Sequence, residues 1–217
     1  MSDTDSFIDE VTEELRRDQL FRLIRKYGWI AILLVLILVG GAAFNEFRKA
    51  RIALASQDLG DSILEALKTE NPADRAAALQ KLREDGDKAT ILALLKANED
   101  FSADDISAAQ QALSQIALDA NQPLIYRHLA EFKLLLIQGD ALPAAERMSR
   151  FESLAIPGAP FRLLAEEQMA LTEMATGKTD AALKRLQEIL ADGEVTAGLR
   201  RRVSQLIVAL GGALEPA

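Results

Sequence analysis

Hydrophobic residues follow two patterns along this chain. Residues 27–45, YGWIAILLVLILVGGAAFN, contain no charged side chain. A helix of these 19 residues would reach about 28 Å at about 1.5 Å per residue, close to the hydrocarbon thickness of a bilayer. After residue 45 the apolar residues recur at spacings of three and four, the period of an amphipathic helix. The pattern predicts one membrane-spanning helix followed by a region of amphipathic helices.

The residues flanking the apolar segment predict its orientation. We expect the membrane anchor to be formed by Tyr27, Trp29, Leu33, Leu36 and Phe44. The aromatic rings of Tyr27 and Trp29 are expected at the membrane interface. The preceding flank carries the basic residues Arg16, Arg17, Arg22, Arg25 and Lys26, and the following flank carries Arg48, Lys49 and Arg51. Because the flank richer in Lys and Arg usually stays in the cytoplasm, the sequence predicts a single-pass protein with its N-terminus inside.

Two other interpretations of residues 27–45 remain. Gly41-Ala42-Ala43 could be the cleavage site of a signal peptide. The apolar run is longer than the usual core of about 7–15 residues, however, and the tail before it mixes acids with bases. A buried core helix is the third interpretation, but core helices rarely lack a polar face over such a length.

The region after residue 45 is expected to be entirely helical. It is rich in Ala and Leu and poor in the β-branched and aromatic residues that strands favour. The predicted helices cover residues 44–69, 73–84, 88–98, 103–119, 123–137, 144–154, 161–175, 179–191 and 197–210. Ser102, with Asp105 three residues later, predicts a capping box, and Thr179 is a candidate N-cap.

The predicted helices form pairs at a regular interval. The first members begin near Lys88, Pro123, Pro160 and Val195, which are 35, 37 and 35 residues apart. Tetratricopeptide repeats have two helices in about 34 residues, and each pair must stack on its neighbours to bury its apolar face. The spacing therefore favours a tetratricopeptide-like α-solenoid of helical hairpins. An ordinary helical bundle with coincidental spacing is the alternative.

The unit that begins at Pro160 fits the repeat pattern best. Small residues and a glycine turn would let its two helices approach closely, and larger apolar residues would fill the contact. The residues predicted to pack the repeat are Ala170, Gly177, Ala182, Leu186 and Ile189. The earlier units match the pattern less well, since the second carries extra residues around Gly139–Pro143.

Charge and composition exclude several classes of function. Acidic residues outnumber basic ones by 33 to 25, giving a net charge of −8, and most of the excess follows residue 45. Such a region lacks the basic patch that nucleic acids require, so no nucleic-acid partner is expected. The chain has no cysteine, which rules out disulfides, thiolate catalysis and cysteine-ligated zinc.

No set of residues predicts a catalytic, cofactor-binding or metal-binding site, so we expect a protein that is not an enzyme and has no cofactor. His128 is the only histidine, beside Arg127, and its expected role is solvation or packing. Asp104-Asp105, Glu166-Glu167 and Asp85-Gly-Asp87 are expected at helix starts, on exposed faces or in a turn. The basic cluster Arg200-Arg201-Arg202 is interpreted as a solvated face near acids, or as a docking patch for an acidic partner.

The chain resembles the YfgM-like, tetratricopeptide-repeat-like inner-membrane proteins of Gram-negative bacteria, and its tail resembles the alphaproteobacterial members. The resemblance rests on DEVTEELRRDQLFRLIRKYGW before one apolar span, and on a C-terminal region beginning APFRLLAEEQMALTEMATGKTDAALKRLQEIL. In such proteins a helix with a central Leu-Ala, a turn with a glycine and an Ala-Ala-Leu second helix recur in the same place. The resemblance implies a periplasmic helical domain, ancillary to the SecYEG translocon and linking it to periplasmic chaperones and folding factors.

The expected organisation is a cytoplasmic tail at 1–26, a transmembrane helix at 27–45, a tetratricopeptide-like domain at 46–210 and a flexible tail at 211–217. The function expected is that of a membrane-anchored scaffold for protein–protein interaction in the periplasm. Two alternatives stay open. One is a structural membrane protein that forms homo-oligomers through the helix at 44–69, and the other is an enzyme whose site the sequence does not reveal.

Overall fold

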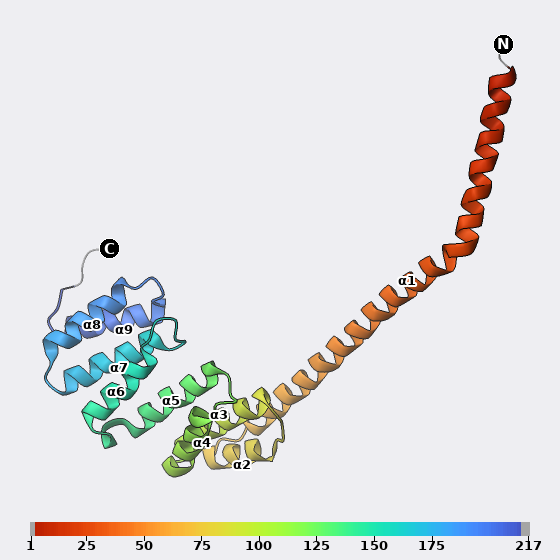
Figure 1. Ribbon diagram of the computed structural model, residues 1–217. Coiled ribbons are helices and arrows are strands. Elements are labelled where there is room, and N and C mark those ends of the chain that lie inside the picture. Colours follow the sequence, from red (N-terminus) through yellow and green to blue (C-terminus); the bar gives the residue numbers. More distant parts are fainter. Residues whose placement is uncertain (1–2, 214–217) are drawn as a thin grey trace. The chain divides into compact units, whose positions relative to one another are not determined.

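The computed structural model describes the backbone of residues 3–213, and the side chains of residues 25–213 except those at positions 27, 28, 31, 32 and 35. Every regular element in this part of the chain is helical (Figure 1). The helices are α1 (Asp3–Ala66), α2 (Pro72–Lys81), α3 (Asp87–Ser102), α4 (Ile106–Leu118), α5 (Leu124–Gln138), a 3₁₀ turn η1 (Gly139–Ala141), α6 (Ala144–Leu154), α7 (Arg162–Ala175), α8 (Thr179–Ala191) and α9 (Ala197–Ala209). The prediction of an all-helical chain is therefore confirmed over these residues.

The chain divides into two compact units. The first, Met1–Ser62, consists of most of α1 where the structure describes it. The second, Ile63–Ala217, contains the end of α1 and all the later helices. The second unit contains the buried core and is the one that positions the candidate site.

The apolar segment of the first unit lies inside the continuous helix α1. Of the predicted anchor and flank residues, Trp29, Leu33, Leu36, Phe44, Arg25 and Lys26 are described and lie exposed. The side chains of Tyr27, Arg16, Arg17 and Arg22 lie outside the described set. A search of the described residues identifies no helix with both the length and the apolar character needed to cross a membrane, so the predicted span gains no support there.

Several helix boundaries have a clear local cause. The side chain of Asn71 accepts a hydrogen bond from the Ala73 amide, and Pro72 occupies the first turn of α2. Thr196 caps α9 through its hydroxyl, which accepts from the Leu199 amide. The helices predicted over 144–154 and 179–191 are confirmed with the same bounds.

Two predicted caps are wrong. Ser102 is the last residue of α3, and its hydroxyl donates to the carbonyl oxygen of Asn98 instead of capping the next helix. Asp105 caps α4, because its carboxylate accepts from the amide of Ala108. Thr179 is the first residue of α8 and makes no cap bond there, since the cap position belongs to Lys178.

Each helix of the second unit packs mainly against the helices next to it in the sequence. The buried residues accordingly form three clusters, each drawn from three successive helices. The N-terminal cluster joins α3, α4 and α5 through Leu94, Ala97, Leu113, Ile116, Ala130 and Leu134. The middle cluster joins α5, α6 and α7 through Phe132, Leu135, Phe151, Leu154, Ala165 and Met169. The C-terminal cluster joins α7, α8 and α9 through Leu163, Ala170, Leu186, Ile189, Leu199, Val203 and Ile207.

Helices α5 and α7 belong to two clusters each. In α5, Ala130 and Leu134 pack in the N-terminal cluster, whereas Phe132 and Leu135 pack in the middle one. Each pair is spaced by three or four residues, so it occupies one side of the helix. Such an arrangement is typical of a stacked array, in which each repeat is stabilised by its neighbours.

The residues predicted to pack the last repeat lie at the contact of α7 and α8 with their neighbours. Ala170, Leu186 and Ile189 share the C-terminal cluster, and Ala182 is also fully buried. Gly177 has a φ of 75°, a left-handed conformation that glycine adopts without strain, and it connects the two helices.

A cavity mutation should separate a stacked array from a single-core bundle. We expect Leu186→Ala to destabilise the full-length chain by about 2–5 kcal/mol, because Leu186 is fully buried. We also expect faster hydrogen exchange in α7–α9 with little change in α3–α5, because the clusters are separate. Leu118→Ala, at a position on α4 that is 80% exposed, is the matched control. Equal acceleration in every helix would show one cooperative bundle instead.

Candidate interaction groove

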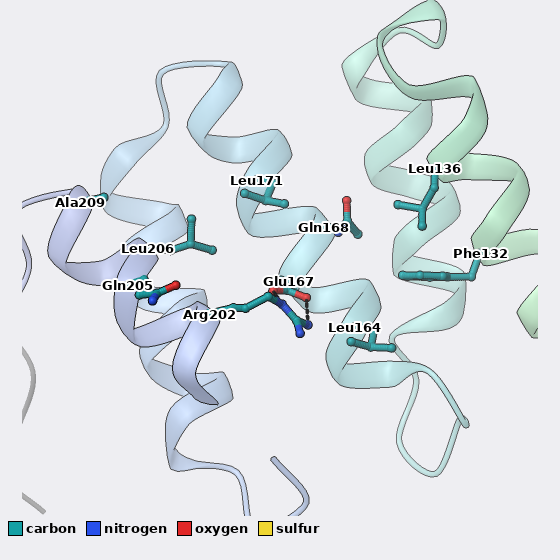
Figure 2. Close-up of a pocket in the computed structure, with 10 residues that line it drawn as sticks. All are labelled: Phe132, Leu136, Leu164, Glu167, Gln168, Leu171, Arg202, Gln205, Leu206 and Ala209. Carbon is teal, nitrogen blue, oxygen red and sulfur yellow. Dashed lines mark hydrogen bonds and ion pairs between the residues drawn. The ribbon is translucent and has the colours of Figure 1, made fainter. Parts of the chain in front are cut away.

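An open cavity of about 640 Å³ lies between α5, α7 and α9 (Figure 2). It is lined by Phe132 and Leu136 of α5, by Leu164, Glu167, Gln168 and Leu171 of α7, and by Arg202, Gln205, Leu206 and Ala209 of α9. Figure 2 shows Phe132 and Leu136 facing the side chains of α7 across this space. We call this cavity the groove.

Helical periodicity brings the lining residues of each helix together. On α7 they stand at positions 164, 167, 168 and 171, and on α9 at 202, 205, 206 and 209. Both sets follow the same spacing of 0, 3, 4 and 7, which lines them along one face of a helix. The two helices therefore present side chains to the groove at the same spacing, although the residue types differ between them.

The middle of the groove contains an ion pair between α7 and α9. The Arg202 guanidinium donates from Nε and Nη2 to the two Glu167 carboxylate oxygens, at 2.8 and 2.7 Å. Glu167 is only 5% exposed, whereas the Arg202 side chain is half exposed. This bidentate bond raises the pKa of Arg202 and fixes the register of the two helices.

The apolar lining continues toward α3. A second cavity, of about 160 Å³, is bounded by Asn98 and Phe101 of α3 and by Lys133, Leu136 and Ile137 of α5. Leu136 borders both cavities, and it and Phe101 are each almost half exposed. Exposed and half-buried apolar side chains thus extend from α3 through α5 and α7 to α9.

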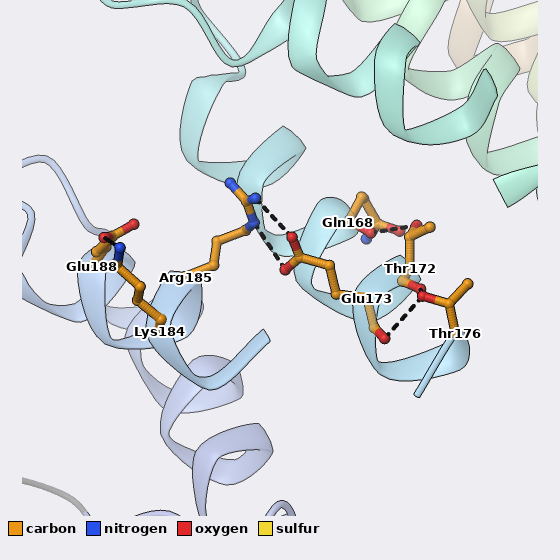
Figure 3. A network of polar contacts seen from close by, with 7 residues as sticks. All are labelled: Gln168, Thr172, Glu173, Thr176, Lys184, Arg185 and Glu188. Carbon is orange, nitrogen blue, oxygen red and sulfur yellow. Dashed lines mark hydrogen bonds and ion pairs between the residues drawn. The ribbon is translucent and has the colours of Figure 1, made fainter. Parts of the chain in front are cut away.

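Arginine–carboxylate pairs join neighbouring helices around the groove. Arg185 of α8 donates from Nε and Nη2 to the buried Glu173 of α7, at 3.1 and 2.8 Å (Figure 3). Arg150 of α6 donates to Glu131 of α5 at 2.9 Å, and also to Gln138. These bonds fix α8 against α7 and α6 against α5, in addition to the apolar contacts between the same helices.

Arg162 joins the start of α7 to the loop after α8. Its Nη2 donates to Asp192 at 2.7 Å and to Glu194 at 2.9 Å. These hydrogen bonds raise the pKa of Arg162, first through Glu194 and then through Asp192. The pKa of Asp192 is lowered, chiefly by the Glu194 amide and then by Arg162.

The structure separates the residues that the sequence singled out for possible chemistry. His128 lies half-buried on α5, where burial lowers its pKa and its Nδ1 has no partner among the described residues. Within the described part of the chain, no cluster of His, Asp and Glu has the geometry to hold a metal ion. Glu166 and Glu167 were expected on an exposed face, which is wrong for Glu167, because it is buried against Arg202.

Two of the three arginines at 200–202 form bonds with neighbouring helices. Arg202 forms the ion pair in the groove, and Arg200 donates to the carbonyl oxygen of Leu190 at 3.2 Å. Arg201 is exposed. The interpretation as a basic face beside acids therefore holds for Arg202.

Sequence reasoning missed the groove itself. Its apolar members, such as Leu136, Leu171 and Leu206, have the same periodicity as the core residues next to them. The available signal was the width of the apolar stripe on α7 and α9, which exceeds what a two-helix contact needs.

Comparison with known proteins identifies one family. Residues 25–154 match the family described as tetratricopeptide repeat-like domain, which is more than half of the chain. The match includes the apolar segment 27–45 and ends before the unit from Pro160, where the sequence pattern fits best. No curated protein and no solved structure matches the chain.

The arginine pairs can be tested by comparing two pairs on α8. We expect Arg185→Met to destabilise the chain by about 3 kcal/mol, because it leaves the Glu173 carboxylate buried and unpaired. Lys184→Met should cost at most about 1 kcal/mol, since the Lys184–Glu188 pair is largely exposed (Figure 3). Urea unfolding followed by circular dichroism measures both. Equal losses of stability in the two variants would contradict the stabilising role of the Arg185–Glu173 pair. Adding Glu173→Leu to Arg185→Met should restore much of the stability.

Proposed function

Because the chain belongs to the tetratricopeptide repeat-like domain family, we propose that it is a non-enzymatic scaffold that binds a segment of another protein in the groove of α5, α7 and α9. The observation that carries this proposal is the open, largely apolar groove, lined by one face of α7 and one face of α9, with Phe132 and Leu136 opposite. Repeat arrays use such extended surfaces to bind protein segments.

The chemistry of the groove fits a segment with apolar side chains. Leucines and Phe132 supply apolar surface, while Gln168 and Gln205 can donate and accept hydrogen bonds at its border. Glu167 and Arg202 neutralise one another, so they bring no net charge into the groove. A helix with apolar residues at spacings of three and four could place them between α5, α7 and α9.

The proposal extends to the location of the protein. Residues 27–45 would anchor it in the bacterial inner membrane with the N-terminus in the cytoplasm and residues 46–210 in the periplasm. The uncharged sequence of that segment and the basic residues before it support this topology. Anchoring would raise the effective concentration of the groove near a membrane-bound partner. The resemblance to YfgM-like proteins points to the SecYEG translocon and periplasmic folding factors as partners.

Homo-oligomerisation through the helix at 44–69 is the second candidate function. Its support is a set of exposed apolar side chains on α1, namely Phe44, Phe47, Ile52, Leu54 and Leu64. Such residues are typical of helices that pair with another chain. The mass of the full-length protein in detergent, measured over a range of concentrations, distinguishes a monomeric scaffold from an oligomer.

The binding surface can be located by crosslinking inside cells. A photo-crosslinking amino acid at Gln205, in the groove, should give a few discrete adducts, because a bound segment would lie against it. The same residue at Val208, which is exposed on α9 but does not line the groove, is the matched control. Equal adducts from both positions, or none from Gln205, would contradict the proposal.

The topology has a separate test. Alkaline phosphatase fused after residue 217 should be active, because this enzyme requires the oxidising periplasm to form its disulfides. The chain should also stay with the membranes after a carbonate wash, since a spanning helix is held by the lipid core. Release by carbonate, or an inactive fusion beside an active cytoplasmic reporter, would refute the anchored topology.

A further inference from the structure

A smaller cavity adjoins the groove on the side of α6. It has a volume of about 160 Å³, several times what one water needs. Leu136, Gln168 and Leu171 line both the groove and this cavity, so the two cavities are direct neighbours. The remaining wall includes Asp140 of η1 and Arg147 of α6. We call this cavity the side pocket.

Arg147 is incompletely paired for a guanidinium that is largely buried. Its side chain is only 12% exposed, and its Nε is buried without a hydrogen-bond partner among the described residues. Its Nη1 donates to Asp140 at 2.6 Å. Arg185 and Arg202, by contrast, each hold a buried carboxylate with two bonds. A guanidinium presents a fork of donors that suits a carboxylate with two oxygens.

The present partner of Arg147 can be replaced at little cost. The Asp140 side chain is 98% exposed, so it can give up the pair at little cost when another carboxylate takes its place at Arg147. When Asp140 turns away it is solvated, whereas Arg147 keeps its place in the pocket wall. Of the residues whose side chains are described, Asp140 and Arg147 are the only charged ones that line this pocket.

We infer that the side pocket binds the carboxylate of an aspartate or glutamate side chain from the protein segment that occupies the groove. The carboxylate replaces Asp140 and accepts from the Arg147 guanidinium, through the Nη1 donor that otherwise holds Asp140. Apolar residues on either side of the acid lie against α7 and α9. This inference rests on the proposed function, and it adds that the partner segment is apolar with an internal acid.

Selection from randomised peptides tests the inference without knowledge of the partner. One library displays short peptides joined to the carrier at both ends, and a second leaves their C-termini free. Both are selected on the purified full-length chain in detergent, and on the variants Arg147→Gln, Asp140→Asn and Arg201→Gln. Arg201 is exposed on α9 outside both cavities, so its variant controls for the loss of a positive charge.

The expected result is enrichment of apolar peptides with an internal acid, binding about tenfold tighter than the same peptides with Asn or Gln in its place. Arg147→Gln should abolish the preference for the acid and retain apolar peptides. Arg201→Gln should behave like the natural chain. Asp140→Asn should strengthen the preference, because it removes the competing carboxylate while its amide oxygen can still accept from Arg147.

The contradicting results are distinct. Apolar peptides without an acid would overturn the inference and leave the proposed function standing. Acids selected only as free C-termini would show that the pocket takes a terminal carboxylate instead of a side chain. A preference that survives Arg147→Gln would remove Arg147 from the site. Failure of every library to enrich on the natural chain would overturn the proposed function itself.

Discussion

The structure depends on the inability of one helical hairpin to bury its own apolar face. Helices α5 and α7 solve this by packing on two sides, each taking part in two of the three clusters. The N-terminal and middle clusters are therefore each completed by the first helix of the next hairpin, and the C-terminal cluster by α9. The bidentate pairs of Arg185 and Arg202 add directional bonds to these non-directional contacts.

The groove is a consequence of the same arrangement. On α7, Leu163 and Ala170 enter the C-terminal cluster, while Leu164 and Leu171, one position later, line the groove. A step of one residue turns the helix by about 100°, so core and groove lie on adjacent faces. The residues that stabilise the array thus set the orientation of those that would contact a partner. This coupling explains how the helical array presents a defined surface.

Much of the fold follows from sequence periodicity, whereas the site follows from packing. The spacing of Leu186 and Ile189 predicts a buried face, and the structure buries both. The burial of Glu167 could not be foreseen, because it requires Arg202, 35 residues away, to face it across two helices. The cap at Asp105 was missed for a related reason, since α3 continues through Ser102 and moves the next start. The side pocket at Arg147 likewise depends on how three helices meet.

The central claim is that the groove is occupied in the cell, and the absence of cysteine allows a direct test. Single cysteines placed at Leu136, Leu171 or Gln205 would each be the only thiol in the chain. The account predicts slower alkylation of these thiols in intact cells than in the purified protein, with no such difference for cysteines at Leu118 and Val208. Equal alkylation in both settings at the groove positions would contradict it.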